Sequence, residues 1–177
     1  MITSDSLERL RGWFTGRLPD TWQAEPPEVT ADREEILVLL HLPDVPLSEG
    51  ASDAEATEAR AGRAKAFREE TRDQRMAIAR EAQRRYGRTV SWGVVIGQGE
   101  HGHRELFTHL AAPVMTRLRQ PQRQVLDTLV DSGVARSRAD ALAWCVRLVG
   151  QHEQDWLAQL RSAMDTVAEV RDKGPTA

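Results

Sequence analysis

The residues of this sequence that could do chemistry are mostly arginines, and the clearest group lies close to residue 117. Arg117 and Arg119 alternate with Met115 along residues 114–119, so an extended backbone would turn all three side chains to one face. A guanidinium group can donate two hydrogen bonds at once to the O6 and N7 atoms of a guanine. Met115, Arg117 and Arg119 would therefore form one contact surface if this segment faced DNA.

A second group, formed by Arg136, Ser137 and Arg138, lies where a helix is expected to begin. The run from Ser137 to Asp140 is typical of a capping box, with aspartate at the position where glutamate is usual. Backbone amides at a helix N-terminus attract phosphate, and neighbouring arginines add positive charge. We therefore predict that Arg136, Ser137 and Arg138 contact DNA phosphates.

Four elements are needed to position these two groups. The sequence predicts a strand over residues 114–119, a helix over Pro121–Asp131, a turn with Gly133, and a second helix from Arg138 to about Val170. Alternation would turn Val114, Thr116 and Leu118 towards the helices. Only the last residues, Asp172–Ala177, have the composition of a disordered tail.

The order of strand, helix, glycine turn and capped helix resembles the ribbon-helix-helix (MetJ/Arc/CopG-like) family of DNA-binding proteins. The matching blocks are Thr116–Leu118, Leu126–Val130, Gly133, Ser137–Leu142 and Val146–Val149. The resemblance implies a homodimer in which each chain contributes one strand to an antiparallel ribbon that enters the major groove of double-stranded DNA. It also implies that Met115, Arg117 and Arg119 are the base contacts. One departure is Arg119–Gln120 at the junction of strand and helix, where a proline or serine is common in that family.

Other interpretations of the same segment remain open. Met115, Arg117 and Arg119 could form the solvated face of an edge strand, followed by a plain helical hairpin. The fold could also build a dimer that binds a protein partner without DNA, as an antitoxin-like or scaffold module. The apolar seam that continues along the last helix could serve as an additional dimer contact or pack on the N-terminal part.

The N-terminal part is expected to be an α/β region of helix, strand, long helix and β-hairpin. Its predicted elements are a helix over Ser6–Leu18, a loop over 19–34, a strand over Glu35–Leu42 covered on both faces, a helix over Ser52–Tyr86 closed by Gly87, and strands over Val90–Ile96 and Glu105–Leu110. The chain is thus predicted to be α+β. We expect an N-terminal domain of unknown role over 1–111 and the ribbon-helix-helix module with its extended last helix over 112–177.

Other motifs give no comparable signal. Gly97, Gly99 and Gly102 have dinucleotide-motif spacing, but a strand rather than a helix is expected after them. His101, His103 and His109 lack a further ligand at a persuasive spacing. Cys145 is expected to be a buried structural thiol. We therefore expect no metal, no cofactor and no enzymatic activity.

The arginines of the predicted long helix are interleaved with acidic residues, which is typical of a solvated, ion-paired helix. Acidic residues are fewer towards the end of that helix and just beyond it, where further phosphate contacts could form. The arginines there are Arg80, Arg84, Arg85 and Arg88.

Bulk properties limit where a DNA-binding surface could lie. The 177 residues carry a formal net charge of −3, so any basic surface must be local.

The start of the chain lacks the pattern of a signal peptide, and the apolar run Ile36–Leu40 is too short to span a bilayer. The chain has many arginines and only two lysines, and it resembles uncharacterised actinobacterial proteins that carry such a module. We expect a cytoplasmic, nucleoid-associated protein that regulates transcription or binds the chromosome.

Overall fold

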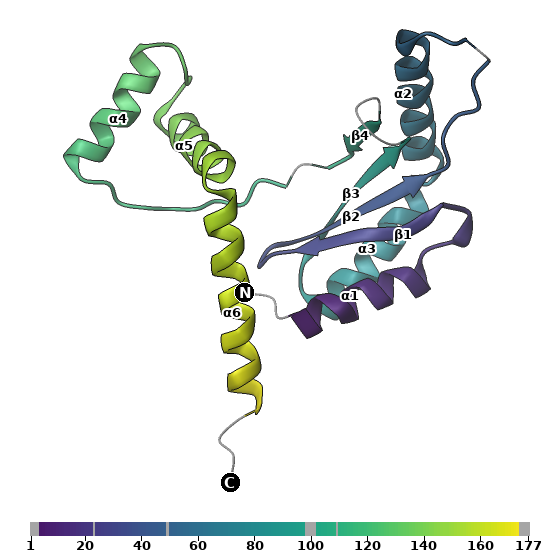
Figure 1. Cartoon of the computed structure of the whole chain (residues 1–177), viewed down its shortest axis with the longest axis horizontal. Coiled ribbons are helices and arrows are strands. Elements are labelled where there is room, and N and C mark those ends of the chain that lie inside the picture. Colours follow the sequence, from purple (N-terminus) through teal and green to yellow (C-terminus); the bar gives the residue numbers. More distant parts are fainter. Residues whose placement is uncertain (1–3, 23, 49, 98–101, 109, 174–177) are drawn as a thin grey trace. The chain divides into compact units, whose positions relative to one another are not determined.

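The structure, a computed structural model, describes residues 4–22, 24–48, 50–97, 102–108 and 110–173 (Figure 1). The chain divides into two compact units, residues 1–112 and 113–177. The first holds a four-stranded sheet and helices, whereas helices are the regular elements of the second. The predicted α+β class is confirmed.

The sheet of the N-terminal unit has the spatial order β1-β2-β3-β4. Its strands are β1 (Glu25–Ala31), β2 (Glu35–Leu42), β3 (Thr89–Ile96) and β4 (His103–Leu106). The two central strands β2 and β3 are parallel, and each edge strand is antiparallel to its neighbour. The predicted strands over 35–42 and 90–96 and the pairing of a hairpin strand with β3 are confirmed.

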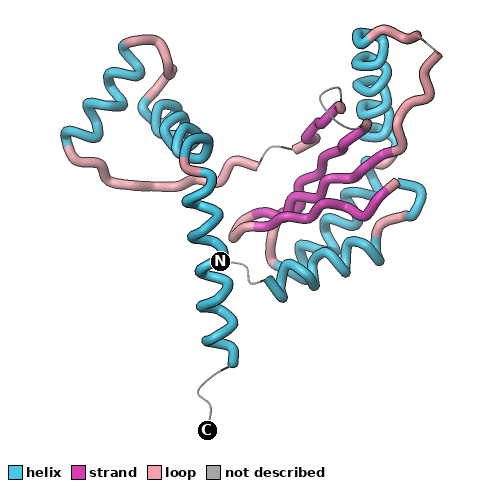
Figure 2. Tube along the Cα trace, viewed as in Figure 1, coloured by secondary structure: helices cyan, strands magenta, loops and turns pink. Residues whose placement is uncertain are grey.

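Three α-helices accompany the sheet: α1 (Ser4–Arg17), α2 (Asp53–Glu70) and α3 (Arg72–Tyr86). A short 3-10 helix, η1 (Asp20–Trp22), follows α1. Parallel neighbouring strands need a crossover connection, and α2 and α3 supply it between β2 and β3. Figure 2 shows α1 and α3 on the same side of the sheet.

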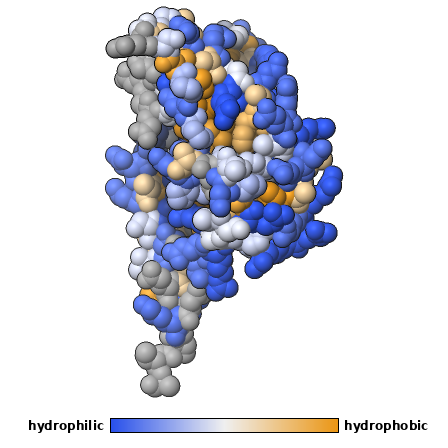
Figure 3. All heavy atoms as spheres, turned by 90° about the vertical axis from the view of Figure 1, so that its right-hand side faces the viewer, coloured by the Kyte–Doolittle hydropathy of each residue, from blue (hydrophilic) through white to orange (hydrophobic). Residues whose placement is uncertain are grey.

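The core of this unit lies between the helices and one face of the sheet. Even-numbered residues of β2 and β3 are in register, so that Val38 pairs with Trp92 and Leu40 with Val94. These side chains are buried together with Phe14 of α1. On the other face of β2, Leu39 is buried but Leu37 and His41 are half-buried, so only one face is fully covered. On the side of the molecule drawn in Figure 3, hydrophilic residues (blue) cover most of the surface and hydrophobic residues (orange) show in smaller areas.

The prediction of a loop over residues 19–34 was wrong, because this segment contains η1 and strand β1. Pro26 and Pro27 indicated a loop, since proline cannot donate to a sheet ladder. β1 is an edge strand with β2 as its single neighbour, and its register shifts between Glu25 and Glu28. The prolines lie in that irregular stretch, between the pairs Glu25–His41 and Glu28–Leu39, where the missing N–H of proline interrupts no regular ladder.

The predicted single helix over Ser52–Tyr86 is two helices that meet at Thr71. The Thr71 hydroxyl donates to the carbonyl oxygen of Phe67 at 2.6 Å and accepts from the Nε atom of Arg75 at 2.9 Å. At the far end, Gly87 has a φ of 69° and closes α3 as predicted. The second hairpin strand is His103–Leu106 and not Glu105–Leu110.

The C-terminal unit contains α4 (Gln120–Asp131), α5 (Arg138–His152) and α6 (Gln154–Lys173). The first helix and the turn at Gly133, which has a φ of 78°, agree with the prediction. The predicted continuous helix from Arg138 is interrupted at Glu153, the C-cap of α5. The helix α6 also includes Asp172 and Lys173, which were expected to begin a disordered tail.

Residues 114–119 form no strand in the single chain. Arg119 has the extended dihedral angles φ −78° and ψ 166°. A strand requires a neighbour to which its backbone can bond, and a ribbon-helix-helix module would take that neighbour from a second copy. The ribbon is therefore not shown.

Across the described part of the chain, no helix combines the length and the apolar character needed to cross a bilayer.

Candidate nucleic-acid interface

The C-terminal unit has a small core beneath the predicted DNA-contacting residues. Leu126 of α4, Ala135 of the turn and Ala141 of α5 are buried there. Leu118 packs against this cluster, as alternation along 114–119 predicted. Val114 and Thr116 do not pack on the helices: Val114 is 88% exposed and Thr116 is also exposed. In one chain, residues 114–117 have no partner strand to hold them over the core.

The three predicted base contacts all point to solvent. Met115 is 97% exposed, and Arg117 and Arg119 are exposed. Neither arginine forms an ion pair with any residue that the structure describes. The backbone amide of Arg119 donates to the side chain of Gln122 at 2.9 Å, so the guanidinium extends from an ordered helix start. Both guanidinium groups are available to an external acceptor.

The predicted cap at the start of α5 is confirmed. The Ser137 hydroxyl accepts from the amide of Asp140 at 3.2 Å. The Asp140 carboxylate accepts from the backbone amide of Arg136 at 3.0 Å. A negative charge thus already lies at this helix N-terminus, where a phosphate was predicted to bind. The side chain of Arg136 is 95% exposed and lies 3.8 Å from the Asp140 carboxylate.

Arg138 has a partner that the sequence did not reveal. Its Nε and Nη2 atoms donate to the two carboxylate oxygens of Asp127 at 2.6 and 2.8 Å. Hydrogen bonding from Arg138 lowers the pKa of the Asp127 carboxyl group. The pair ties α5 to α4 and leaves fewer donors for a phosphate. No periodicity joins residues 11 positions apart on two helices, so only the tertiary packing could reveal the pair.

The local charge around the predicted contacts differs from that of the whole chain. Residues 113–152 contain six arginines and three aspartates, which gives a net charge of +3 with histidine neutral. The whole chain carries −3. The basic surface expected for nucleic-acid binding can therefore be local to residues 113–152, although the whole unit over 113–177 carries only +1.

Two of the three histidines noted in the sequence, His101 and His109, lie outside the described residues, as do Gly99 and the tip of the hairpin. The Nε2 atom of His103 lies 3.3 Å from a carboxylate oxygen of Glu105. Within the described part of the chain no three potential metal ligands cluster. Cys145 is half-buried beside the small core and not fully buried as expected.

The arginines at the end of α3 have different surroundings. Arg80 and Arg84 are exposed, and the Arg85 guanidinium lies 5.6 Å from the centre of the Tyr86 ring. Arg88 donates to the carbonyl oxygens of Asp32 and Tyr86. The Arg88 guanidinium therefore already bonds to backbone carbonyls of the fold. A phosphate contact by Arg80, Arg84 or Arg85 stays a prediction.

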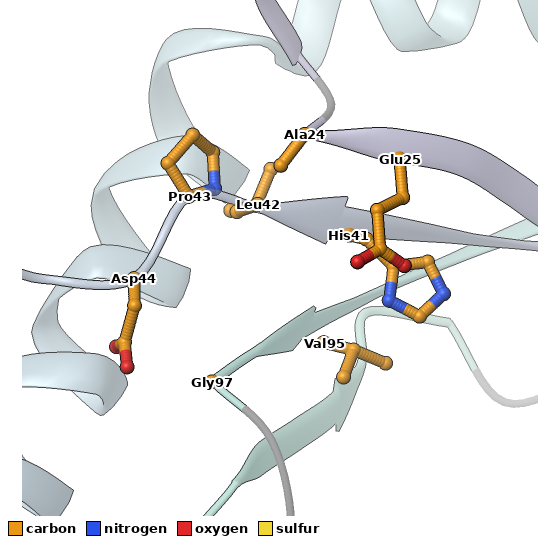
Figure 4. Close-up of a pocket in the computed structure, with 8 residues that line it drawn as sticks. All are labelled: Ala24, Glu25, His41, Leu42, Pro43, Asp44, Val95 and Gly97. Carbon is orange, nitrogen blue, oxygen red and sulfur yellow. The ribbon is translucent and has the colours of Figure 1, made fainter.

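A cavity of about 340 Å³ lies at the carboxyl ends of the parallel strands β2 and β3, the usual place for ligands in open α/β sheets (Figure 4). Glu25 pairs with His41 in the sheet register, and the Nε2 atom of His41 lies 3.2 Å from a carboxylate oxygen of Glu28. Asp44 accepts two hydrogen bonds from Arg60, both at 2.8 Å. These bonds lower the pKa of the Asp44 carboxyl group, which favours a structural ion pair over an acid-base role.

Comparison with known proteins gives the family of the chain. Residues 8–102, more than half of the chain, match the model described as "Rv1265-like protein, N-terminal domain". The chain belongs to the Rv1265-like family. Residues 119–171 match the model described as "Mb1296 C-terminal domain". Neither matching model is a ribbon-helix-helix family, and the second begins after residues 114–118.

The relatives of this family that match the chain come from mycobacteria. "Uncharacterized protein Rv1265" of Mycobacterium tuberculosis (strain ATCC 25618 / H37Rv) is 59% identical over 163 residues, which cover 92% of this chain and 69% of the relative. "Uncharacterized protein Mb1296" of Mycobacterium bovis has the same identity and coverage. The resemblance to uncharacterised actinobacterial proteins is thereby confirmed. No solved structure matches the chain.

Proposed function

We propose that this protein is a dimeric DNA-binding protein, either a transcriptional regulator or a chromosome-associated protein. Residues 114–119 of two copies would pair as an antiparallel ribbon, and Met115, Arg117 and Arg119 would enter the major groove. The observation that carries the proposal is the exposure of these residues beside a helical pair with only three buried side chains among its described residues.

The small core supports the proposal of a dimer, and the local positive charge supports the proposal of DNA binding. A unit of this size with so little buried apolar surface is only marginally stable alone, and a second copy could cover Val114 and the exposed apolar residues of the helices. The net charge of +3 over residues 113–152 would be doubled in a dimer. Counterion release from DNA would then make binding strongly dependent on salt.

The test is a binding titration with the duplexes that co-purify with the protein, against random duplex of equal length, at several salt concentrations. Replacing both Arg117 and Arg119 by alanine should abolish the preference while the dimer stays folded. Each lost bidentate contact is worth about 1–3 kcal/mol of discrimination. A matched control is Arg147→Ala together with Arg161→Ala, which removes the same charge from α5 and α6. Unchanged preference in the first variant would show that this segment does not read DNA.

A dimeric interaction module without DNA binding is the second candidate, and two observations favour it. Asp127 holds Arg138, and the Asp140 carboxylate lies at the start of α5, so two of the predicted phosphate-binding groups are partly occupied. An interaction module predicts no affinity for random duplex near physiological salt.

If Arg138 contacts phosphate despite its partner, Arg138→Gln should weaken binding to all sequences equally and flatten the salt dependence.

A further inference from the structure

Arg75 on α3 is a buried cation without a counter-ion among the residues that the structure describes. Arg75 is only 7% exposed. The Nε atom donates to the Thr71 hydroxyl at 2.9 Å, and Nη2 donates to the carbonyl oxygen of Arg68 at 2.6 Å. Both acceptors are neutral. No described carboxylate forms an ion pair with Arg75, although buried arginines are almost always paired.

The charges around Arg75 have the same sign. Burial lowers the pKa of the Arg75 guanidinium, and the nearby charges of Arg68 and Arg72 lower it further. Arg68 is partly compensated, since its Nη1 atom lies 3.9 Å from a carboxylate oxygen of Glu105. Arg72 is exposed and has no described partner. The site therefore holds excess positive charge at a buried position.

These three arginines line one cavity of about 250 Å³. Its remaining wall is largely apolar and includes Trp92 of β3 and Phe107 after β4. The Arg75 guanidinium lies 4.9 Å from the centre of the Phe107 ring, a cation–π distance. The cavity is smaller than the roughly 300–1,000 Å³ that is usual for drug-sized ligands, so it suits a smaller molecule.

We propose that this cavity binds a small organic oxyanion joined to a flat apolar group, held by Arg72 and Arg75 at its charged end and by Trp92 and Phe107 at its apolar end. The planar fork of arginine fits a carboxylate or a phosphate in the same bidentate way. An anion would supply the counter-charge that no described residue provides. The aromatic wall would favour an organic anion over an inorganic one. This site lies in the N-terminal unit and does not depend on DNA binding.

The test is a titration of the isotope-labelled chain of 177 residues with benzoate, acetate and inorganic phosphate at constant ionic strength, followed by NMR. Benzoate should shift the amide signals of Val90–Trp92 and Phe107 in a saturable way. Its affinity should exceed that of acetate by about tenfold or more, because the ring buries apolar surface that acetate lacks. Phosphate that binds as tightly as benzoate would overturn the organic part of the proposal. The absence of a saturable shift with all three probes would overturn the site.

Variants separate a specific site from general attraction between anions and a basic helix. Arg72→Gln should weaken benzoate binding by about tenfold, through loss of a charge-assisted hydrogen bond, without unfolding the chain, because Arg72 is exposed. Arg80→Gln is the matched control, since Arg80 lies exposed on the same helix and does not line the cavity. Arg75→Gln should abolish binding if the variant folds. Equal effects of Arg72→Gln and Arg80→Gln would overturn the proposal.

Discussion

The two units of the chain bury their apolar side chains to very different extents. In the N-terminal unit, the described residues place eighteen hydrophobic side chains in one buried cluster between a sheet and its helices. In the C-terminal unit, the corresponding cluster has three buried members. The first unit therefore resembles a domain that folds alone, whereas the second resembles one part of a larger core.

The exposed apolar residues of the second unit have a periodic arrangement. Along α6, Trp156, Leu160, Met164 and Val167 recur at helical spacing and are 42–68% exposed. Such a stripe costs free energy in water unless another surface covers it. The fold of the N-terminal unit can therefore be understood from its own residues, whereas the proposed dimer would give the C-terminal unit a second surface to cover its exposed apolar side chains.

The largest expected effect is a loss of stability confined to the N-terminal unit. Phe14 is fully buried and packs edge-to-face against Trp13 and Trp92, with ring centres 4.8 and 6.1 Å apart. Phe14→Ala should lower the free energy of unfolding of this unit by about 3–5 kcal/mol, because it leaves a cavity. Urea titration followed by NMR would report the unfolding of each unit separately.

Thr15→Ala is the matched control, because Thr15 is the exposed neighbour of Phe14 on α1. It should change the free energy of unfolding by no more than about 0.5 kcal/mol. In the Phe14 variant, the C-terminal signals should keep their original urea midpoint. If the signals of both units moved together, the two units would unfold as one, and the contrast between them would be wrong.

The same contrast explains which features the sequence could predict. Apolar runs over 35–42 and 90–96 predict central strands, because such residues have to be covered locally. Gly87 and Gly133 predict helix ends, because the left-handed conformation favours glycine. These are local properties, and the structure confirms each of them.

The features that the sequence missed depend on tertiary partners. The break at Thr71 coincides with a hydrogen bond from Arg75, which nothing in the helical pattern of residues 52–86 indicates. β1 was missed because an edge position tolerates Pro26 and Pro27. At the candidate interface, the sequence predicted the Ser137 cap but not the Asp127 partner of Arg138. The base contacts stay predictions, since the ribbon needs a second chain.

The second prediction concerns the dimer. Neighbouring residues of an antiparallel strand alternate in which amide points to the partner, so either Met115→Pro or Thr116→Pro must remove a ladder bond. In a symmetric ribbon both chains lose that bond. At about 0.5–1.5 kcal/mol for each, the loss is about 1–3 kcal/mol, or roughly 5–150-fold in the dissociation constant of the dimer. Analytical ultracentrifugation over a concentration series would measure it.

Ala111→Pro is the control for these variants, because Ala111 is exposed and precedes the predicted strand. It should leave the dissociation constant unchanged. A loss of hydrogen bonds within one chain would not explain a weaker dimer, because no described hydrogen bond of the single chain uses the backbone N–H of Met115 or Thr116. A dimer that tolerates both proline variants would mean that the copies do not associate through residues 114–119.

The smallest expected effect is the pH dependence of the Asp127–Arg138 pair. Arg138 lowers the pKa of the Asp127 carboxyl group in the fold, so the unfolded chain takes up a proton at higher pH than the folded chain does. The pair should therefore stabilise the C-terminal unit fully above the ordinary aspartate pKa of about 3.9 and lose its effect as the pH falls through the lower value. Thermal unfolding of the wild type and of Asp127→Asn between about pH 5 and pH 2 would measure the difference.

The wild type should unfold at a higher temperature than Asp127→Asn at the upper end of this pH range, and the two melting temperatures should converge at the lower end. Arg138→Gln should show the same convergence, because it removes the other half of the pair. Asp131→Asn is the control, since Asp131 is exposed at the end of α4 and no described ion pair involves it. If Asp127→Asn kept a constant offset over the whole range, the two helices would be joined by packing at Leu126 and Ala141 and not by this ion pair.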